Sequence, residues 1–194
     1  MFPKLEYIGN VYRPSDDTWL LLSMVDEVKP RGRLCIDLGA GSGIVGLYAM
    51  LNGYCEKVVF VDISDHAVGT TKYNAELNGV DHRALVVQSD STVLIEGVAD
   101  VVMANPPYLP AYSPEELDIT TEGGVEGYET AVYFVEFASS ALRQGGLLFM
   151  VYSSLSKPEI IEHSIVTQGF RILWSKSKNF FYETIIAVGC EKSW

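Results

Sequence analysis

The sequence predicts an α/β protein with a doubly wound, mostly parallel sheet of seven strands, and three observations support this fold class. From residue 31 onward, short apolar runs alternate with stretches of helical periodicity. Strands covered by helices on both faces are apolar along their whole length, which is the pattern of a parallel sheet. A glycine-rich turn at 37–43 follows the first run. Two strand-like runs without a helix between them end the chain, so we expect a C-terminal antiparallel hairpin.

The seven expected strands are short runs rich in Val, Ile, Leu and Phe, which pack well on a pleated surface. The fourth run stops at Asn105, because Pro106 and Pro107 have no N–H for a ladder and hold the preceding residue extended. In chain order, the strands are expected at 33–39, 57–63, 84–90, 99–105, 147–153, 170–181 and 183–192.

The expected helices alternate with these strands, and local signals mark several of their ends. Ser64 is suited to cap the helix that follows the second strand. Glycines close the helix expected over 128–146. We interpret residues 1–30 as a short helical cover on one domain that comprises 31–194, with Ser15 or Asp16 as its helix cap. In chain order, the helices are expected at 14–28, 44–53, 64–78, 128–146 and 157–168.

Composition argues against several classes of protein. The chain has 25 acidic and 14 basic residues, a formal charge of −11, and no basic cluster, which disfavours a direct nucleic-acid partner. No apolar run approaches the roughly 20 residues that span a bilayer, and the N-terminus lacks a signal-peptide pattern. We therefore expect a cytoplasmic protein without membrane contact.

The cysteines and histidines do not suggest a metal site. The three cysteines are far apart and mostly in apolar surroundings, so we expect buried small hydrophobic residues instead of a disulfide or a zinc site. The histidines are dispersed and are expected at the surface or as caps. These residues are Cys35, Cys55, Cys190, His66, His82 and His163.

Polar residues and glycines occur where four of the expected strands end. In open α/β sheets, ligands bind outside the carboxyl ends of the strands. An acidic residue such as Asp62 can accept hydrogen bonds from both hydroxyls of a ribose, and Ser64 serves better than Asp62 as the helix cap. Taken singly, the glycines could form a mere tight turn and Asp90 an ordinary loop carboxylate. Together the features predict an adenosine pocket formed by Asp37, Gly39, Gly41, Asp62, Asp90 and Asn105.

The glycine turn favours one adenosine cofactor over the others. The sequence GAGSGIVG lacks the Lys and Ser/Thr of a phosphate-binding P-loop. The acidic Asp37 just before the glycines suits the positively charged amino end of a sulfonium ligand. S-adenosyl-L-methionine therefore fits better than ATP or NAD.

Four motifs together resemble a known enzyme family. They are YRPSDDTWLLL at 12–22, DLGAGSG at 37–43, NPPY at 105–108 and GGVEGYE at 123–129. With Asp62 and Asp90, they are similar to release factor glutamine N5-methyltransferases of the HemK2/Mtq2 type, the archaeal and eukaryotic branch of the HemK family. That family has a Rossmann-like class I methyltransferase fold, so the resemblance agrees with the predicted sheet. For GGVEG alone, a flexible loop is an equal alternative.

The resemblance implies roles for individual positions. Asn105, Pro106 and Tyr108 would be catalytic: the Asn105 oxygen and the Pro106 carbonyl would accept the two N–H groups of a substrate amide, and Tyr108 would pack on its plane. Pro107 would join them in binding the substrate. The implied cofactor-binding residues are Tyr12, Thr18, Asp37, Gly39, Gly41, Asp62, Asp90, Ser91 and Asn105.

The resemblance also implies a substrate and a partner. The substrate would be the glutamine of the GGQ motif in a class 1 peptide chain release factor. A small zinc-binding activator of the Trm112 type would form a heterodimer by pairing with the exposed edge strand at 84–90. Alternatives are methylation of an exocyclic amino group of a nucleic-acid base, methylation of a protein lysine, and a non-catalytic cofactor-binding scaffold.

Overall fold

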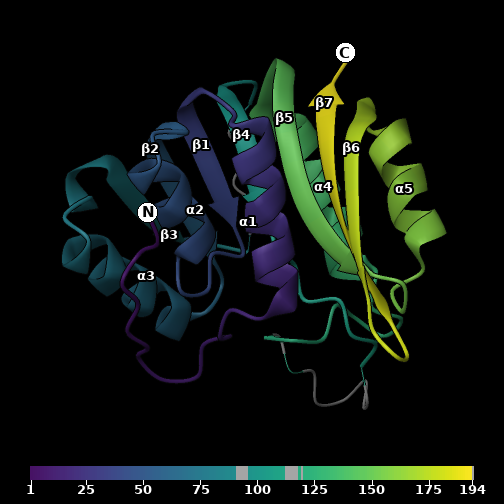
Figure 1. Cartoon of the computed structure of the whole chain (residues 1–194), viewed down its shortest axis with the longest axis horizontal. Helices are drawn as coiled ribbons and strands as arrows, with labels where there is room; N and C mark the ends of the chain where they lie inside the picture. Colours follow the sequence, from purple (N-terminus) through teal and green to yellow (C-terminus); the bar gives the residue numbers. More distant parts are fainter. Residues whose placement is uncertain (91–95, 112–117, 119, 194) are drawn as a thin grey trace.

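The computed structural model describes residues 1–90, 96–111, 118 and 120–193. Seven strands form a sheet in the order β3-β2-β1-β4-β5-β7-β6 (Figure 1). The five strands from β3 to β5 are parallel, and β7 is antiparallel to both β5 and β6. The doubly wound, mostly parallel sheet with a C-terminal antiparallel hairpin is therefore confirmed.

The elements lie close to the ranges that the sequence predicts. The strands are β1 Gly32–Leu38, β2 Cys55–Asp62, β3 Ala84–Gln88, β4 Ala99–Ala104, β5 Leu142–Ser153, β6 Phe170–Asn179 and β7 Thr184–Lys192. The α-helices are α1 Asp16–Val28, α2 Ile44–Leu51, α3 Asp65–Leu77, α4 Glu129–Ala141 and α5 Pro158–Thr167, and Asp81–Arg83 form a short 3-10 turn, η1. Among the described helices, none is long and apolar enough to cross a bilayer.

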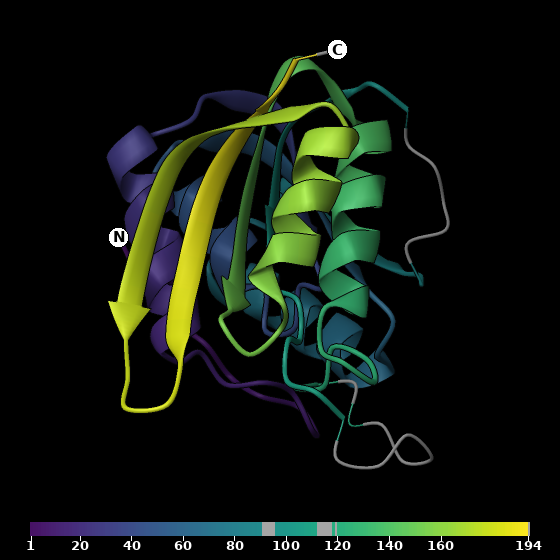
Figure 2. The ribbon, with the colours of Figure 1, turned by 90° about the vertical axis from the view of Figure 1, so that its right-hand side faces the viewer.

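The sheet separates two hydrophobic cores, because alternate residues of each buried strand point to opposite faces. On one face, Cys35 and Phe60 pack with α1, α2 and α3. On the other face, Ile36 and Val61 pack with α4 and α5. Figure 2 shows the sheet between α1 on one side and α4 with α5 on the other. Both faces are covered, which explains why these strands have no polar side in the sequence.

The ends of the helices follow local chemistry in part. Ser64 caps α3 as expected, accepting a hydrogen bond from the Ala67 N–H at 3.4 Å. Of the two expected caps of α1, Ser15 occupies the N-cap position, but its side chain makes no capping hydrogen bond.

The expected helix over 128–146 is too long, because α4 ends at Ala141 and β5 already begins at Leu142. Leu142 is fully buried and pairs with Ala99 of β4. The Arg143 guanidinium next to it binds the Asp100 carboxylate at 2.6 Å. These contacts with β4 stabilise an extended chain where sequence periodicity favours a helix.

The expectation that the cysteines form no disulfide is also wrong. Cys35 and Cys55 are joined by a disulfide, with 6.0 Å between their Cα atoms. They lie on the neighbouring strands β1 and β2, and both are buried, as expected for small apolar residues. Cys190 is free and buried. The pairing was missed because sequence spacing alone does not say which strands are neighbours.

Residues before α1 run along the outside of α2 and α3 toward the carboxyl ends of the strands, where α1 begins (Figure 1). α1 then packs against β5, β6 and β7, so it covers the hairpin half of one sheet face. The N-terminal segment thus contributes to the layer that encloses the strand ends.

Two helical glycines test the packing of the helices on the sheet. A Cβ on Gly46 of α2 would lie 2.4 Å from Phe60 Cε1 and 2.9 Å from Val58 Cγ1, whereas a Cβ on Gly69 of α3 would meet no heavy atom within 4 Å. We expect Gly46→Ala to lower the free energy of unfolding by about 1–3 kcal/mol through overpacking. Gly69→Ala, the matched control, should raise it by about 0.5–1 kcal/mol through helix propensity.

Urea denaturation of both variants checks this expectation. A Gly46→Ala variant as stable as the Gly69→Ala variant would contradict the close packing of α2 on β2.

Candidate active site

A cavity of about 440 Å³ opens at the carboxyl ends of β1, β2 and β4, the lower edge of the sheet in Figure 1. Its volume lies within the range of roughly 300–1,000 Å³ that is usual for small-molecule sites. Ser91 lies outside the described residues. The lining contains every other site residue that the sequence predicts: Tyr12, Thr18, Asp37, Gly39, Gly41, Asp62, Asp90, Asn105, Pro106, Pro107 and Tyr108.

The glycine turn after β1 brings backbone to the cavity wall. Gly39 and Gly41 have positive φ angles of 68° and 55°, which L side chains rarely adopt. A Cβ on Gly39 would also lie 3.0 Å from the Phe134 ring of α4. The Gly41 N–H donates to Asp62 Oδ2 at 2.8 Å, so the carboxylate at the end of β2 fixes the turn.

The two carboxylates at the ends of β1 and β2 have raised pKa values. Burial raises the pKa of Asp37 to about 7, the Gly46 N–H that donates to it lowers the pKa, and the nearby Asp62 charge raises it. Burial also raises the pKa of Asp62, although the N–H groups of Gly41 and Ser64 lower it. Both carboxylates would gain from a positively charged ligand in the cavity.

Asp90, two residues after β3, lies at another part of the cavity wall. Its backbone carbonyl accepts a hydrogen bond from the Tyr133 hydroxyl of α4 at 3.0 Å. Tyr133 and Phe134 of α4 also line the cavity, although the sequence did not predict them as site residues. These rings give that wall an apolar surface suited to a planar group.

Asn105 occupies the point where β4 ends. Its Nδ2 donates to Thr18 Oγ1 at 3.2 Å and to Asp17 Oδ2 at 3.3 Å, both in α1. These acceptors fix the orientation of the amide, because a flipped side chain would direct its oxygen at the Asp17 carboxylate. In the part of the chain that the structure describes, Asn105 Oδ1 is the buried side-chain polar atom without a hydrogen-bond partner. The site therefore contains an oriented acceptor that is unpaired within the described residues.

Asp17 is the residue that the sequence interpretation missed. Its side chain is buried, with 2% exposure, and lies in the first turn of α1. It accepts hydrogen bonds from the Thr18 N–H and hydroxyl and from three side chains outside α1, those of Tyr12, Asn105 and Tyr108. The sequence did contain a signal for Asp17. It falls on the same helical face as the buried Leu21, where burial of a carboxylate is costly unless the group has hydrogen-bond partners.

The two tyrosines remain donors to this carboxylate. Burial, and next the charge of Asp17, raise the pKa of both Tyr12 and Tyr108 well above the ordinary value for tyrosine. Their hydroxyls donate to Asp17 at 2.9 and 3.3 Å respectively. Tyr12 of the N-terminal segment and Asn105 after β4 are thus joined through the Asp17 side chain.

The segment GGVEG is packed against NPPY and is not independent of it. A Cβ on Gly123 would lie 2.4 Å from the Pro107 carbonyl oxygen, and one on Gly127 would lie 2.6 Å from the Tyr108 carbonyl oxygen. The Gly123 N–H also donates to the Leu109 carbonyl at 2.9 Å. The glycines let two backbones approach closely, which sets the path of the chain after Asn105.

Comparison with known proteins decides the family. A family model described as the methyltransferase small domain matches residues 14–178. The chain belongs to this methyltransferase family. A Methanocaldococcus jannaschii relative with the provisional name protein N5-glutamine methyltransferase is 30% identical over 189 residues, covering 95% of this chain and 93% of its own.

Two further methyltransferases extend the comparison. Methyltransferase HEMK2 of Homo sapiens is 26% identical over 201 residues, covering 95% of this chain and 91% of its own. The solved structure of the E. cuniculi Mtq2–Trm112 complex, described as responsible for methylation of the eRF1 translation termination factor, matches with a TM-score of 0.65 and 24% identity. That match covers 94% of this chain and 99% of the other, and it shows the same fold. The relatives confirm the HemK2/Mtq2 resemblance seen in the sequence motifs.

As a methyltransferase site, the cavity separates into two parts. Carboxylates and glycines at the ends of β1, β2 and β3, together with aromatic rings of α4, suit a charged nucleoside ligand. Asn105 and the prolines that follow it suit a planar polar group. Among the described residues, no group of three or more His, Cys, Asp or Glu side chains could hold a metal ion.

Loss of the Asp17 carboxylate should impair methyl transfer more than it impairs folding. We expect Asp17→Asn to lower kcat about 10- to 100-fold, because Asn105 and Tyr108 lose the acceptor that orients them. The matched control is Asp16→Asn, since the neighbouring Asp16 is partly exposed and pairs with Lys178. Steady-state kinetics with circular dichroism measure both effects, and equal kcat values for the two variants would contradict the orienting role.

Proposed function

We propose that this enzyme transfers a methyl group from S-adenosylmethionine to the side-chain nitrogen of glutamine in the GGQ motif of a class 1 peptide chain release factor. The observation that carries the proposal is the oriented Asn105 side-chain oxygen, which lines the cavity and has no hydrogen-bond partner among the described residues. A primary amide has two N–H groups in one plane, and such an acceptor is complementary to one of them. Relatives named as glutamine methyltransferases support this choice of amide.

The donor site fits the charge and shape of S-adenosylmethionine. We assign Asp62 to the ribose hydroxyls, Asp37 to the positively charged amino acid end, and the glycine turn to close backbone contact. Asp90 and Ser91 are assigned to the adenine side, together with the ring of Tyr133. Tyr12 and Thr18 close the site from the N-terminal segment. When bound, the cofactor supplies a methyl group that its sulfonium makes electrophilic.

The protein must compensate for a poor nucleophile. The lone pair of an amide nitrogen is delocalised into its carbonyl, so the N–H groups become more positive as the methyl group arrives. We propose that Asn105 Oδ1 and the Pro106 carbonyl accept these two N–H groups, while the Tyr108 ring packs on the amide plane. Acceptors fixed before reaction favour the polarised transition state over the free substrate. The nitrogen gains a methyl group and releases one proton.

Methylation of a nucleic-acid base is the alternative, since a base also presents a planar amino group. A base would have to leave its stack to reach the cavity. The formal charge of −11 opposes a phosphate backbone at the cavity mouth. We therefore favour a protein substrate, and a salt-sensitive transfer to RNA or DNA would reverse that preference.

An activator of the Trm112 type is the proposed partner. β3 is an edge strand of the sheet, as the sequence predicts, and Leu85 on it is 59% exposed. An exposed edge strand with an apolar side chain is a ready template for another strand. The described Mtq2 structure is itself a complex with Trm112.

Donor affinity should depend on pH through Asp37. Because its pKa is about 7 and the donor is cationic, binding favours the ionised form, and the donor Kd should fall as the pH rises. A pKa near 7 implies a decrease of roughly tenfold between pH 6 and pH 8. Isothermal titration calorimetry measures the slope, and Asp37→Asn should flatten it. An unchanged slope in that variant would contradict the assignment.

The raised pKa of Asp37 also makes folding stability depend on pH. The folded-state pKa of Asp37 lies above the unfolded value of 3.8. Its contribution to stability is therefore fully present below about pH 4 and is lost as the pH rises through about 7 in the donor-free protein.

The proposed function is tested by transfer of labelled methyl from S-adenosylmethionine to a class 1 release factor. The controls are a release factor whose GGQ glutamine is alanine, and assays with and without the activator. We expect label on the first protein alone, and Asn105→Ala should lower transfer by about 100-fold or more. Label on both proteins, or on a lysine, would overturn the choice of glutamine, and full activity without the activator would overturn the partner.

A further inference from the structure

The N-terminal segment is attached to α3 by an unusual set of hydrogen bonds. Three alternate residues of the segment each have both backbone groups bound by one side chain of α3 or of its C-cap. The N–H of each residue donates to an amide or hydroxyl oxygen, and its C=O accepts a hydrogen bond from the same side chain. The six distances are 2.8–3.2 Å. The pairs are Lys4 with Asn78, Glu6 with Asn74, and Ile8 with Thr70.

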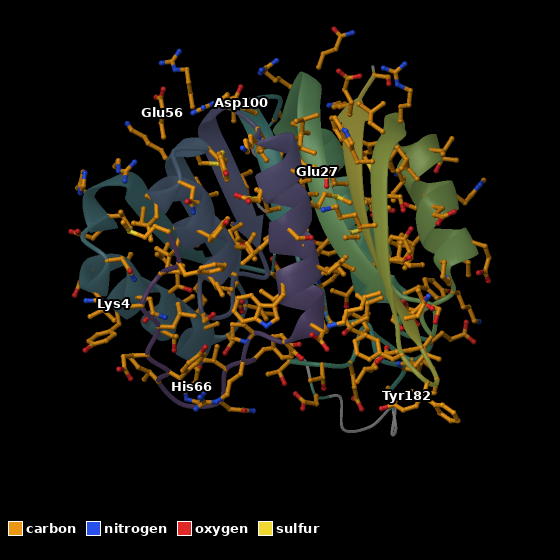
Figure 3. The ribbon with its side chains drawn as sticks, in the orientation of Figure 1. Lys4, Glu27, Glu56, His66, Asp100 and Tyr182 are labelled. Atoms are coloured by element: carbon orange, nitrogen blue, oxygen red, sulfur yellow. A yellow bond between two sulfur atoms is a disulfide. The ribbon has the colours of Figure 1, made fainter. Side chains whose placement is uncertain are left out.

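The spacing of this hydrogen-bond ladder is possible because two residues of extended chain have nearly the same length as four residues of α-helix. Two residues of extended chain rise about 6.6 Å, and four residues of α-helix rise about 6.0 Å. An extended segment can therefore place every second residue opposite every fourth residue of a helix. The segment runs antiparallel to α3, because Lys4 binds Asn78 at the C-cap while Ile8 binds Thr70 nearer the start of the helix. Figure 3 labels Lys4 of the segment and His66 in the first turn of α3.

The ladder explains why α3 contains residues that disfavour helix formation. Thr70, Asn74 and Asn78 occupy one face of α3 or its C-cap, although Thr and Asn are weak helix formers. Thr70 and Asn74 are fully buried. Poor local propensity that persists on one helix face points to a requirement outside the helix.

The ladder anchors the stretch 9–16, which covers part of the cavity and is called the cover below. Asn10, Val11 and Tyr12 follow the ladder after Gly9, and all three line the cavity. Val11 is 8% exposed, and Tyr12 is held by Asp17 at the start of α1. The stretch 9–16 is thus fixed at both ends, by the ladder on one side and by Asp17 on the other.

Asn74 also connects this cover to the glycine turn. Its Nδ2 donates to the Ser42 carbonyl at 2.9 Å as well as to the Glu6 carbonyl. Three positions earlier on α3, the Thr71 hydroxyl donates to the Gly41 carbonyl at 3.0 Å. α3 therefore holds two walls of the donor half of the cavity, the cover and the turn, in one relative position.

We propose that Thr70, Asn74 and Asn78 are positioning residues for the methyl donor, acting by keeping the N-terminal segment closed over it. The proposal rests on the proposed function only for the identity of the donor, S-adenosylmethionine. Opening of the cover would leave a smaller fraction of molecules competent to bind the donor, and the apparent Kd rises by the inverse of that fraction. The Asn105 side chain, which would bind the methyl acceptor, is held by its own hydrogen bonds to Asp17 and Thr18 of α1 and not by the ladder side chains.

The test uses the full chain with Thr70→Val and Asn78→Ala combined. Val has nearly the shape of Thr but lacks the hydroxyl, and the two changes remove four of the six ladder bonds. Asn74 is left intact because it also supports the glycine turn. Glu76→Ala is the matched control, since Glu76 is an exposed residue of the same helix.

Three readouts separate positioning from general structure. Calorimetry gives the donor Kd, which we expect to rise about tenfold in the double variant and to stay within twofold in the control. Hydrogen exchange gives the protection of the Lys4 and Ile8 amides, which lose their acceptors in the double variant. At saturating donor, kcat should change less than twofold while the donor KM rises with Kd.

Several results would overturn the proposal. They are a donor Kd within twofold of wild type despite faster exchange, an unchanged exchange of the Lys4 and Ile8 amides, or a kcat that falls more than twofold at saturating donor while the circular dichroism signal is retained. Thr70→Val alone, a milder change, is expected to show the same direction in Kd if the double variant unfolds. Donor binding does not require the acceptor, so a failure of glutamine methylation would leave this test valid.

Discussion

The cavity depends on one buried carboxylate. Asp17 accepts hydrogen bonds from three other side chains besides its neighbour, and these come from the N-terminal segment and from the turn after β4. In the described part of the chain, no Lys or Arg pairs with it, so hydrogen-bond donors and the positive end of α1 replace a counter-ion. Burial of the Asp17 carboxylate is costly, but this side chain holds the N-terminal segment and the turn after β4 together at the cavity.

This arrangement gives Asn105 an asymmetric environment. One end of its side-chain amide is bound to α1, and the other end has no donor among the described residues. A buried unsatisfied acceptor costs about 1–3 kcal/mol, which a substrate N–H can recover on binding. The prolines then prevent the backbone from returning to the sheet, and the glycines at 123 and 127 let a second segment pack directly against it. The geometry at the strand end is therefore prepared before a substrate arrives.

Sequence reasoning predicted the parts of the molecule that depend on local chemistry. Apolar runs gave the sheet, and Pro106 ended β4 where expected, because these effects act within a few residues. The strand-end rule placed Asp37, Asp62 and Asn105 on the cavity wall, where the structure has them.

Features that depend on distant partners were not predicted. The role of Asp17 requires knowing that the start of α1 meets the end of β4, which lies 88 positions away from it in the contact with Asn105. The Cys35–Cys55 disulfide and the early end of α4 likewise depend on which strands are neighbours. The ladder on α3 was not predicted either, because its backbone partners lie 62 to 74 positions away in the sequence.

The most direct test of this account is a double-mutant cycle between Asp17 and Asn105, with kcat for methyl transfer as the readout. If Asp17 acts through Asn105, the variant with Asp17→Asn and Asn105→Ala together should be hardly slower than Asn105→Ala alone. Because Asp17→Asn alone is expected to cost about 10- to 100-fold in kcat, that corresponds to a coupling of about 1.4–2.7 kcal/mol. Effects that add within about 0.5 kcal/mol would show that the two residues act independently, and would contradict the central role given to the Asp17 carboxylate.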